Sequence, residues 1–76
     1  MTTQTFLTHL ADAMQRDEPL SAQMRLDSIE EWDSLAVVSL IALFHSLFGM
    51  QISGNDLAKC ECISDIIALA GAHIEA

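Results

Sequence analysis

The sequence predicts an all-α fold: a small bundle of four helices, three main ones and a short third one, with a long first loop. Of the 76 residues, 51% are hydrophobic and only 18% are charged, which suits a chain with one modest core and excludes a disordered one. Three stretches repeat their apolar residues at helical spacing. Residues that break helices, Pro19 and Gly49, fall between these stretches.

The first helix is predicted by apolar residues that share one helical face: Phe6, Leu7, Leu10 and Met14. We expect Thr2 or Thr3 to be its N-cap, because a threonine hydroxyl accepts a hydrogen bond from the first turn. The segment Asp17-Glu18-Pro19 should end it, since proline disfavours a helical conformation in the residue before it.

Residues 17–33 show no sustained period and are expected to form a long loop. A connection of this length without regular structure is uncommon in a compact domain and often has a function. Apolar residues scattered along it should hold the loop against the core: Leu20, Met24, Leu26, Ile29 and Trp32.

A second helix is expected from Ser34 to about Phe48, capped by Asp33 and Ser34 at its start and by Gly49 at its end. One apolar face contains Leu35, Val38, Ile41 and Phe48, and further apolar residues cover much of the rest. A helix that is apolar nearly all round is deeply buried or lies at an interface. Its expected outer positions are Ala36, Val37, Ser39, Ala42, His45 and Ser46.

The C-terminal part of the chain predicts two more helices. A short one is expected around residues 55–59. The last is indicated by apolar residues on one face: Ile63, Ile66, Ile67, Ala70 and Ile74. We expect all of residues 1–76 to form a single domain.

The charge of the chain is strongly negative, with 3 basic and 11 acidic residues and a formal net charge of −8. Such a chain is not expected to bind nucleic acid or an anionic membrane surface, because phosphates repel it.

Residues 34–55 carry no charge, but polar residues interrupt them and acids flank them, so we expect no membrane span. The segment Met1-Thr-Thr-Gln-Thr has no basic region and no apolar block behind it, so we expect no secretory signal. Cys60 and Cys62 are too close in sequence for a good disulfide, so a reducing cytoplasm is the expected compartment.

The common catalytic and metal-binding motifs are missing from the sequence. It contains no glycine-rich phosphate loop, no nucleophile elbow and no paired-cysteine zinc pattern. A site made of Cys60, Cys62 and His73 would have to span roughly 16 Å along the last helix. We therefore expect no catalytic residue and no metal site.

The most informative segment is Glu30-Glu31-Trp32-Asp33-Ser34-Leu35. A serine at the start of a helix can hold an anion, because the first backbone N–H groups are unpaired and the helix dipole is positive there. A covalent phosphodiester on Ser34 would therefore be stabilised. The alternative is that Asp33 or Ser34 acts only as an N-cap.

This segment and the register that follows it resemble the acyl carrier proteins and the related peptidyl carrier domains. Their hallmark is Asp-Ser-Leu at the start of the second of four helices, as in Asp33-Ser34-Leu35. The match continues without a gap to the closing pattern Ile63-Ser64-Asp65-Ile66-Ile67, and it is lost when counted from the similar Asp27-Ser28-Ile29. Between Ser34 and the closing pattern, the family's aliphatic and aromatic positions are occupied by Leu35, Val38, Leu40, Ile41, Phe48 and Ile52.

The resemblance implies that a phosphopantetheinyl transferase moves phosphopantetheine from coenzyme A onto Ser34, forming a covalent cofactor. Asp33 would help to orient the transferase and Leu35 would contact it. The chain would then be a non-catalytic carrier of acyl thioesters, a stand-alone acyl carrier protein of specialised lipid, polyketide-like or secondary metabolism. An aminoacyl or peptidyl carrier, and a helical interaction module that carries no arm, remain alternatives. The implied partners are the transferase, an acyl- or aminoacyl-loading ligase and synthase or transferase enzymes, and the chain would be a monomer or weak dimer.

The chain also departs from the family pattern. Fatty-acid carriers have an acidic second helix, whereas residues 35–48 contain no acid and six of the eleven acids lie between residues 17 and 33. Partners should therefore dock by hydrophobic contact. Trp32 either covers the base of the arm or fixes the loop to the core, and Cys62 replaces a threonine and should be a weaker cap. The residues expected to recognise partners are Glu30, Glu31, Trp32, Ala36 and Val37.

Overall fold

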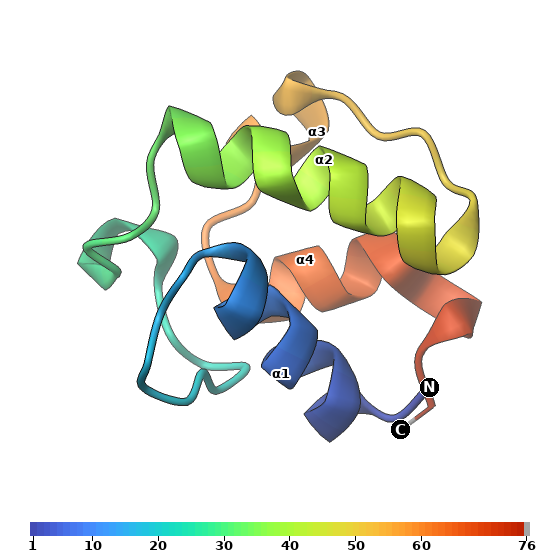
Figure 1. Cartoon of the computed structure of the whole chain (residues 1–76), viewed down its shortest axis with the longest axis horizontal. Helices are drawn as coiled ribbons and strands as arrows, with labels where there is room; N and C mark the ends of the chain where they lie inside the picture. The colour runs from blue at the N-terminus through green and yellow to red at the C-terminus, as the bar shows by residue number, and fades with distance from the viewer. Residues whose placement is uncertain (76) are drawn as a thin grey trace.

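The computed structural model describes residues 1–75 and has the four helices that the sequence predicts (Figure 1). They are α1 (Thr3–Ala13), α2 (Ser34–Phe48), the short α3 (Gly54–Ala58) and α4 (Ile63–Ala70), with 3₁₀ turns η1 (Leu26–Ser28) and η2 (Gly71–His73). In Figure 1, α2 lies across the top of the bundle, with α1 and α4 beneath it and α3 at its upper edge. The fold is all-α, as predicted, and no β-strand occurs within residues 1–75.

Side chains that cap the helices set where each one begins. The Thr2 hydroxyl accepts a hydrogen bond from the Thr5 N–H at 3.2 Å and starts α1. The Asp33 carboxylate accepts one from the Ala36 N–H at 2.9 Å and starts α2. At the start of α4, the Asp65 carboxylate accepts the backbone N–H groups of Glu61 and Cys62 at 2.9 and 3.1 Å. The cap of α4 therefore depends on Asp65 as well as on the residue at position 62.

Residues with positive φ follow the ends of all three main helices, α1, α2 and α4. Gly49 follows α2 with φ +65°, the left-handed conformation that the sequence predicts for its C-terminal cap. The end of α1 was predicted too late: the helix stops at Ala13, and Gln15 has φ +57° although it is not a glycine. The turn at Gln15 directs the chain into the first loop well before Pro19.

The core contains side chains from all four helices, and its centre is aromatic. Phe6, Phe44 and Phe48 form a triangle with ring centroids 5.7 Å apart for each pair. The fully buried side chains around this triangle are Leu10, Leu40, Leu57, Ile63 and Ile66. This cluster fixes α2 over α1 and α4, so the start of α2 projects next to the first loop (Figure 1).

The predicted face of α2 is partly wrong. Leu35 and Val38, expected on the apolar face, are 69% and 62% exposed, whereas Ala36, expected outside, is 4% exposed. The face that packs is Ala36, Leu40 and Phe44, which recur every fourth residue. Because nearly every position of α2 is apolar, periodicity did not identify the buried face. Of the other positions expected outside, Ala42, His45 and Ser46 are exposed, while Val37 and Ser39 are half-buried.

The first loop is fixed to the core, as predicted. Leu20, Leu26 and Ile29 are buried. The Leu26 N–H donates to the Glu61 carbonyl, and the Ile63 N–H donates to the Met24 carbonyl, each at 2.9 Å. These bonds attach the loop to the start of α4 and give the residues before Ser34 a defined position.

The end of the described chain returns to its beginning. Gly71, with φ +57°, ends α4, so Ile74 does not extend the helical face that the sequence predicts. The Glu75 N–H donates to the Met1 carbonyl at 2.8 Å. Within residues 1–75, no helix combines the length and the apolar character needed to cross a bilayer.

Candidate functional site

Ser34 is the first residue of α2, and its side chain is exposed. Asp33 takes the capping position, so the Ser34 hydroxyl is not used as the cap. Among residues 1–75, no side-chain hydrogen bond involves this hydroxyl. Since the first N–H groups of a helix lack partners within it and the dipole is positive there, an anion attached to Ser34 would be stabilised.

Ser28, the serine of the similar tripeptide, lies in a different setting. It belongs to η1, and its hydroxyl donates a hydrogen bond to the Arg25 carbonyl at 2.7 Å. Its neighbour Asp27 pairs with Arg25 at 3.3 Å. Ser28 is therefore held in a 3₁₀ turn, whereas Ser34 begins a helix of 15 residues.

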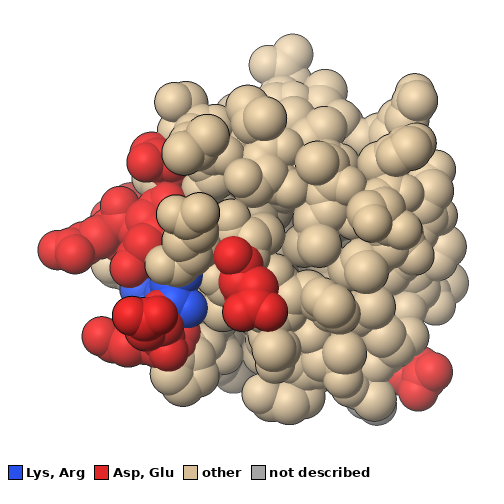
Figure 2. All heavy atoms as spheres, viewed as in Figure 1, with Lys and Arg blue, Asp and Glu red and all other residues tan. Residues whose placement is uncertain are grey.

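Six of the eleven acidic residues lie in residues 17–33, at one end of the molecule. Figure 2 shows most of the visible ones on the left, over the first loop, with a further acidic group near the centre and one at the lower right, while the visible surface over α2 is uncharged. One carboxylate in this region, that of Glu31, accepts a hydrogen bond from Arg16 at 2.8 Å, which holds the pKa of Glu31 below its usual range. Glu30 is exposed.

The residues predicted to recognise partners occupy different environments. The prediction that Ala36 recognises partners is wrong. Ala36 lies on the face of α2 that packs on the core, so it is buried and is not a surface residue. Val37 is half-buried next to Gly54 of α3. Trp32 is half-buried and packs against the core, as expected of a residue that fixes the loop. It lines a hollow that also contains Leu26 and Cys60 and that does not include the residues flanking Ser34.

Two grooves lie along α2. The first, which we call the α1–α2 groove, has a volume of about 320 Å³ and is lined by Ala13, Met14, Gln15, Glu31, Asp33, Leu35, Ala36 and Ser39. The second, the outer groove, has a volume of about 470 Å³ and is lined by Val38, Ile41, Ala42, His45, Met50, Gln51 and Ile52. Sequence reasoning did not single out Val38 and His45 as site residues, although they follow Ser34 by 4 and 11 residues and so share its helical face.

The cysteines lie apart from Ser34, near the start of α4. Both are free thiols. Cys60 donates to the Asp56 carbonyl at 3.5 Å, and burial raises the pKa of its thiol. No group of three or more His, Cys, Asp or Glu side chains that could hold a metal ion occurs among residues 1–75.

The comparison with protein families identifies the chain. The model of a family described as phosphopantetheine attachment site matches residues 4–70, a range that includes α2, α3, α4 and all of α1 except Thr3, and that contains Ser34. Neither the curated proteins nor the solved structures gave a match. Members of this family have a covalently attached phosphopantetheine group, and their carrier domains are non-catalytic proteins that interact with synthases and transferases. An exposed serine hydroxyl at a helix start fits the attachment of such a group. The chain therefore belongs to the phosphopantetheine-binding carrier family.

Proposed function

We propose that Ser34 is the residue that carries the phosphopantetheine arm and that the chain holds acyl groups for its partner enzymes. The single observation that carries this proposal is the exposed hydroxyl of Ser34 at the first position of α2, in contrast to the hydrogen-bonded hydroxyl of Ser28. When bound, the arm supplies a thiol that forms thioesters. The chain itself supplies the attachment point and the surface on which enzymes dock.

Each residue of the tripeptide has a distinct role in this proposal. The Ser34 oxygen holds the phosphodiester, whose negative charge the α2 dipole stabilises. Asp33 fixes the start of α2 through its bond to the Ala36 N–H and helps to orient the transferase. Leu35, 69% exposed beside Ser34, contacts the modifying enzyme.

The composition of the α2 surface favours a carrier of a specialised pathway. Its exposed positions carry no acid, which differs from the acidic second helix of fatty-acid carriers and favours partners that dock by hydrophobic contact. We place the carrier in specialised lipid, polyketide-like or secondary metabolism, in the reducing cytoplasm. Apolar docking also suits an aminoacyl or peptidyl carrier. Identification of the acyl or aminoacyl group on the arm, captured as a thioester, separates these two cargoes.

The structure changes which residues we propose for docking. Glu30 and the exposed part of Val37 remain candidates, whereas the Glu31 carboxylate is occupied by Arg16. Leu35 stays a contact for the transferase, and we add Val38; these are the two large hydrophobic side chains that are exposed within residues 1–75. The partners that dock there are a phosphopantetheinyl transferase, a loading ligase and synthase or transferase enzymes. The single carrier domain over residues 1–76 stays a prediction.

Intact mass tests the proposal. The purified chain is incubated with coenzyme A and a broad-specificity phosphopantetheinyl transferase. We expect wild type and Ser28→Ala to gain one phosphopantetheine, and Ser34→Ala to gain none. A wild-type chain that gains no mass would favour the interaction module without an arm. Modification that persists in Ser34→Ala and disappears in Ser28→Ala would assign the arm to the first loop instead.

A further inference from the structure

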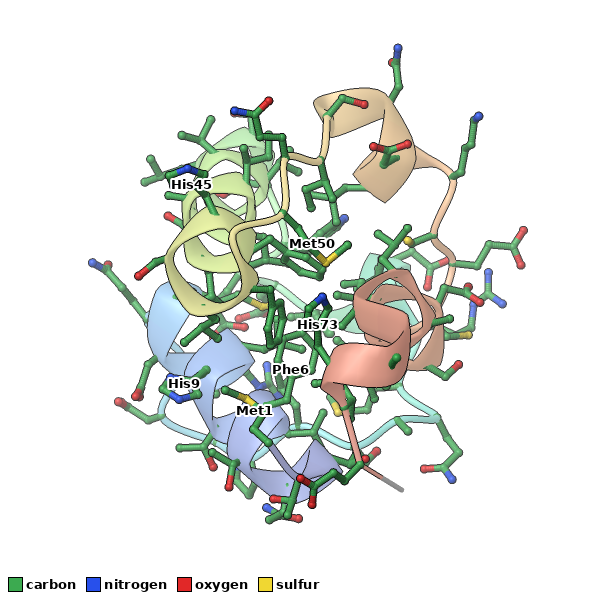
Figure 3. The ribbon with its side chains drawn as sticks, turned by 90° about the vertical axis from the view of Figure 1, so that its right-hand side faces the viewer. Met1, Phe6, His9, His45, Met50 and His73 are labelled. Atoms are coloured by element: carbon green, nitrogen blue, oxygen red, sulfur yellow. The ribbon has the colours of Figure 1, made fainter. Side chains whose placement is uncertain are left out.

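The outward face of α2 has a regular stripe of exposed side chains, which we call the α2 seam. Its residues are spaced alternately by three and four positions, namely Leu35, Val38, Ala42 and His45. Leu35 and Val38 are 69% and 62% exposed. In Figure 3 the His45 side chain projects from α2 away from α1 and α4. Alternating steps of three and four are the spacing with which one helix packs along another, so the α2 seam fits a second helix.

The residues that flank the α2 seam are uncharged. They are Ser34 and Ile41 on one side and Ser39 and Ser46 on the other. In paired helices, charges at these flanking positions decide which partner is accepted and which is repelled. The α2 seam therefore does not require a partner of opposite charge, and it does not repel a second copy of itself.

The two halves of the α2 seam are complementary in shape. The first half has the two large exposed side chains, Leu35 and Val38. The second half has the small Ala42, where the outer groove opens between α2 and the loop after it. Two antiparallel copies of α2, related by a twofold axis at the level of Leu40, bring unlike halves together. Val38 of each copy then lies opposite Ala42 of the other. Leu35 likewise lies opposite His45.

The position of the acidic residues favours this antiparallel direction. Six of the eleven acids lie between residues 17 and 33, before the start of α2, and residues 35–48 contain none. In a parallel pair the two acidic loops would lie side by side and repel each other. In an antiparallel pair about the length of α2 separates them, roughly 22 Å, which is more than twice the screening length of about 8 Å at physiological ionic strength.

We propose that two copies of this chain pair through their α2 seams, antiparallel and with twofold symmetry. The contact is one helical stripe on each copy, which buries less than the roughly 1,200 Å² of a stable interface, so the pair is weak and reversible. It covers Leu35 and Val38, the side chains on which we propose that partner enzymes dock, so a chain is either paired or docked. The pairing involves the unmodified chain and does not depend on an arm at Ser34.

Sedimentation equilibrium of the unmodified chain tests the pairing. The mean mass should rise from 8.3 kDa toward twice that value as the concentration increases to about 1 mM. Ala42→Glu brings two carboxylates close to the twofold axis and should hold the mass at that of one copy. Ala68→Glu adds the same charge at an exposed residue of α4 and should pair like wild type. The proposal is overturned if wild type stays at 8.3 kDa or if the two variants pair equally.

Nuclear magnetic resonance of wild type tests the geometry without a substitution. In a mixture of isotope-labelled and unlabelled chains, filtered experiments detect only the nuclear Overhauser contacts between copies. We expect such contacts between the methyl groups of Val38 and Ala42, and between the Leu35 methyl groups and the His45 ring. Contacts of Val38 with Val38 and of Leu35 with Leu35 would show a parallel pair and overturn the proposal. Contacts between copies that lie outside the α2 seam would overturn it as well.

The outcome for the pair is separate from the outcome for the arm. A chain that pairs in this way and gains no phosphopantetheine keeps the proposal of the α2 seam and loses the proposed function. A chain that gains the arm at Ser34 and stays a single copy at every concentration keeps the proposed function and loses the pair.

Discussion

The Arg16 guanidinium donates from Nη1 to the Glu31 Oε1 at 2.8 Å, which joins the turn after α1 to the loop three residues before Ser34. The Arg16 side chain is only 13% exposed, and its Nε is buried without a hydrogen-bond partner in the described chain. Glu18 lies further away, at 3.6 Å. The pair therefore helps to fix the approach to Ser34.

Loss of this pair should destabilise the fold. In Glu31→Gln the largely buried guanidinium loses its closest charged partner, so the urea midpoint should fall clearly. Arg25→Gln is the control, because Arg25 and Asp27 pair at 3.3 Å on the exposed surface, where solvent screens the interaction. Equal shifts of the two urea midpoints would contradict the claim that the Arg16–Glu31 pair stabilises the fold more than the exposed Arg25–Asp27 pair.

Two leucines on α2 test the corrected face of the helix. Leu40→Ala removes a side chain with no exposed area and should lower the free energy of unfolding by about 3 kcal/mol. Leu35→Ala makes the same change at a residue that is 69% exposed and should cost less than about 0.5 kcal/mol. Urea unfolding followed by circular dichroism measures both. A larger loss of unfolding free energy in Leu35→Ala than in Leu40→Ala would show that Leu35 lies on the packed face of α2, as the sequence predicts.

The cap of α4 should make stability depend on acid pH. Backbone N–H groups of Glu61 and Cys62 lower the pKa of Asp65 below its ordinary value of 3.8. Because the folded pKa is the lower one, the ionised carboxylate stabilises the fold above pH 3.8, and this contribution is lost as the pH falls through the folded pKa. Asp65→Asn should therefore be less stable than wild type at pH 7, and the gap should narrow at pH values well below 3.8.

Urea midpoints at neutral and acid pH check this prediction. Asp17→Asn, at an exposed position of the first loop, is the matched control, and its difference from wild type should change less with pH. A gap for Asp65→Asn that stays constant down to the lowest pH would show that the carboxylate charge is not what stabilises α4.

Apolar docking predicts how the transferase responds to a charge on α2. Val38→Glu places a carboxylate at a side chain that is 62% exposed, one turn after Ser34. Desolvating that charge should lower kcat/KM for arm transfer about tenfold, because a lost contact of this kind costs about 1.4 kcal/mol. Ala68→Glu adds the same charge on α4 and should leave kcat/KM nearly unchanged. If both variants lose the same activity, net charge rather than apolar contact governs docking.

The sequence predicts the parts of the fold that local chemistry determines. Thr2 and Asp33 begin helices because their side chains accept N–H groups of the first turn, and Gly49 ends one because it adopts positive φ. The early end of α1 was not predictable in this way, because its turn places Gln15, a residue with a side chain, at φ +57°.

The site was predictable only in part, and for a physical reason. The position of Ser34 follows from its cap and its register, both of which are local. The exposed face of α2 depends on which of several apolar stripes packs against α1 and α4, and such a choice requires the tertiary structure. For this reason Ala36 was expected outside and is buried, and Val38 and His45 were not recognised as residues that share the face of Ser34.

The most direct test of the account locates the arm on the chain. Cleavage after Arg25 and Lys59 of the modified protein releases one peptide that contains both Ser28 and Ser34. Fragmentation of this peptide in a mass spectrometer determines which serine bears the phosphopantetheine. The account predicts the group on Ser34 alone, and a group on Ser28 would contradict it.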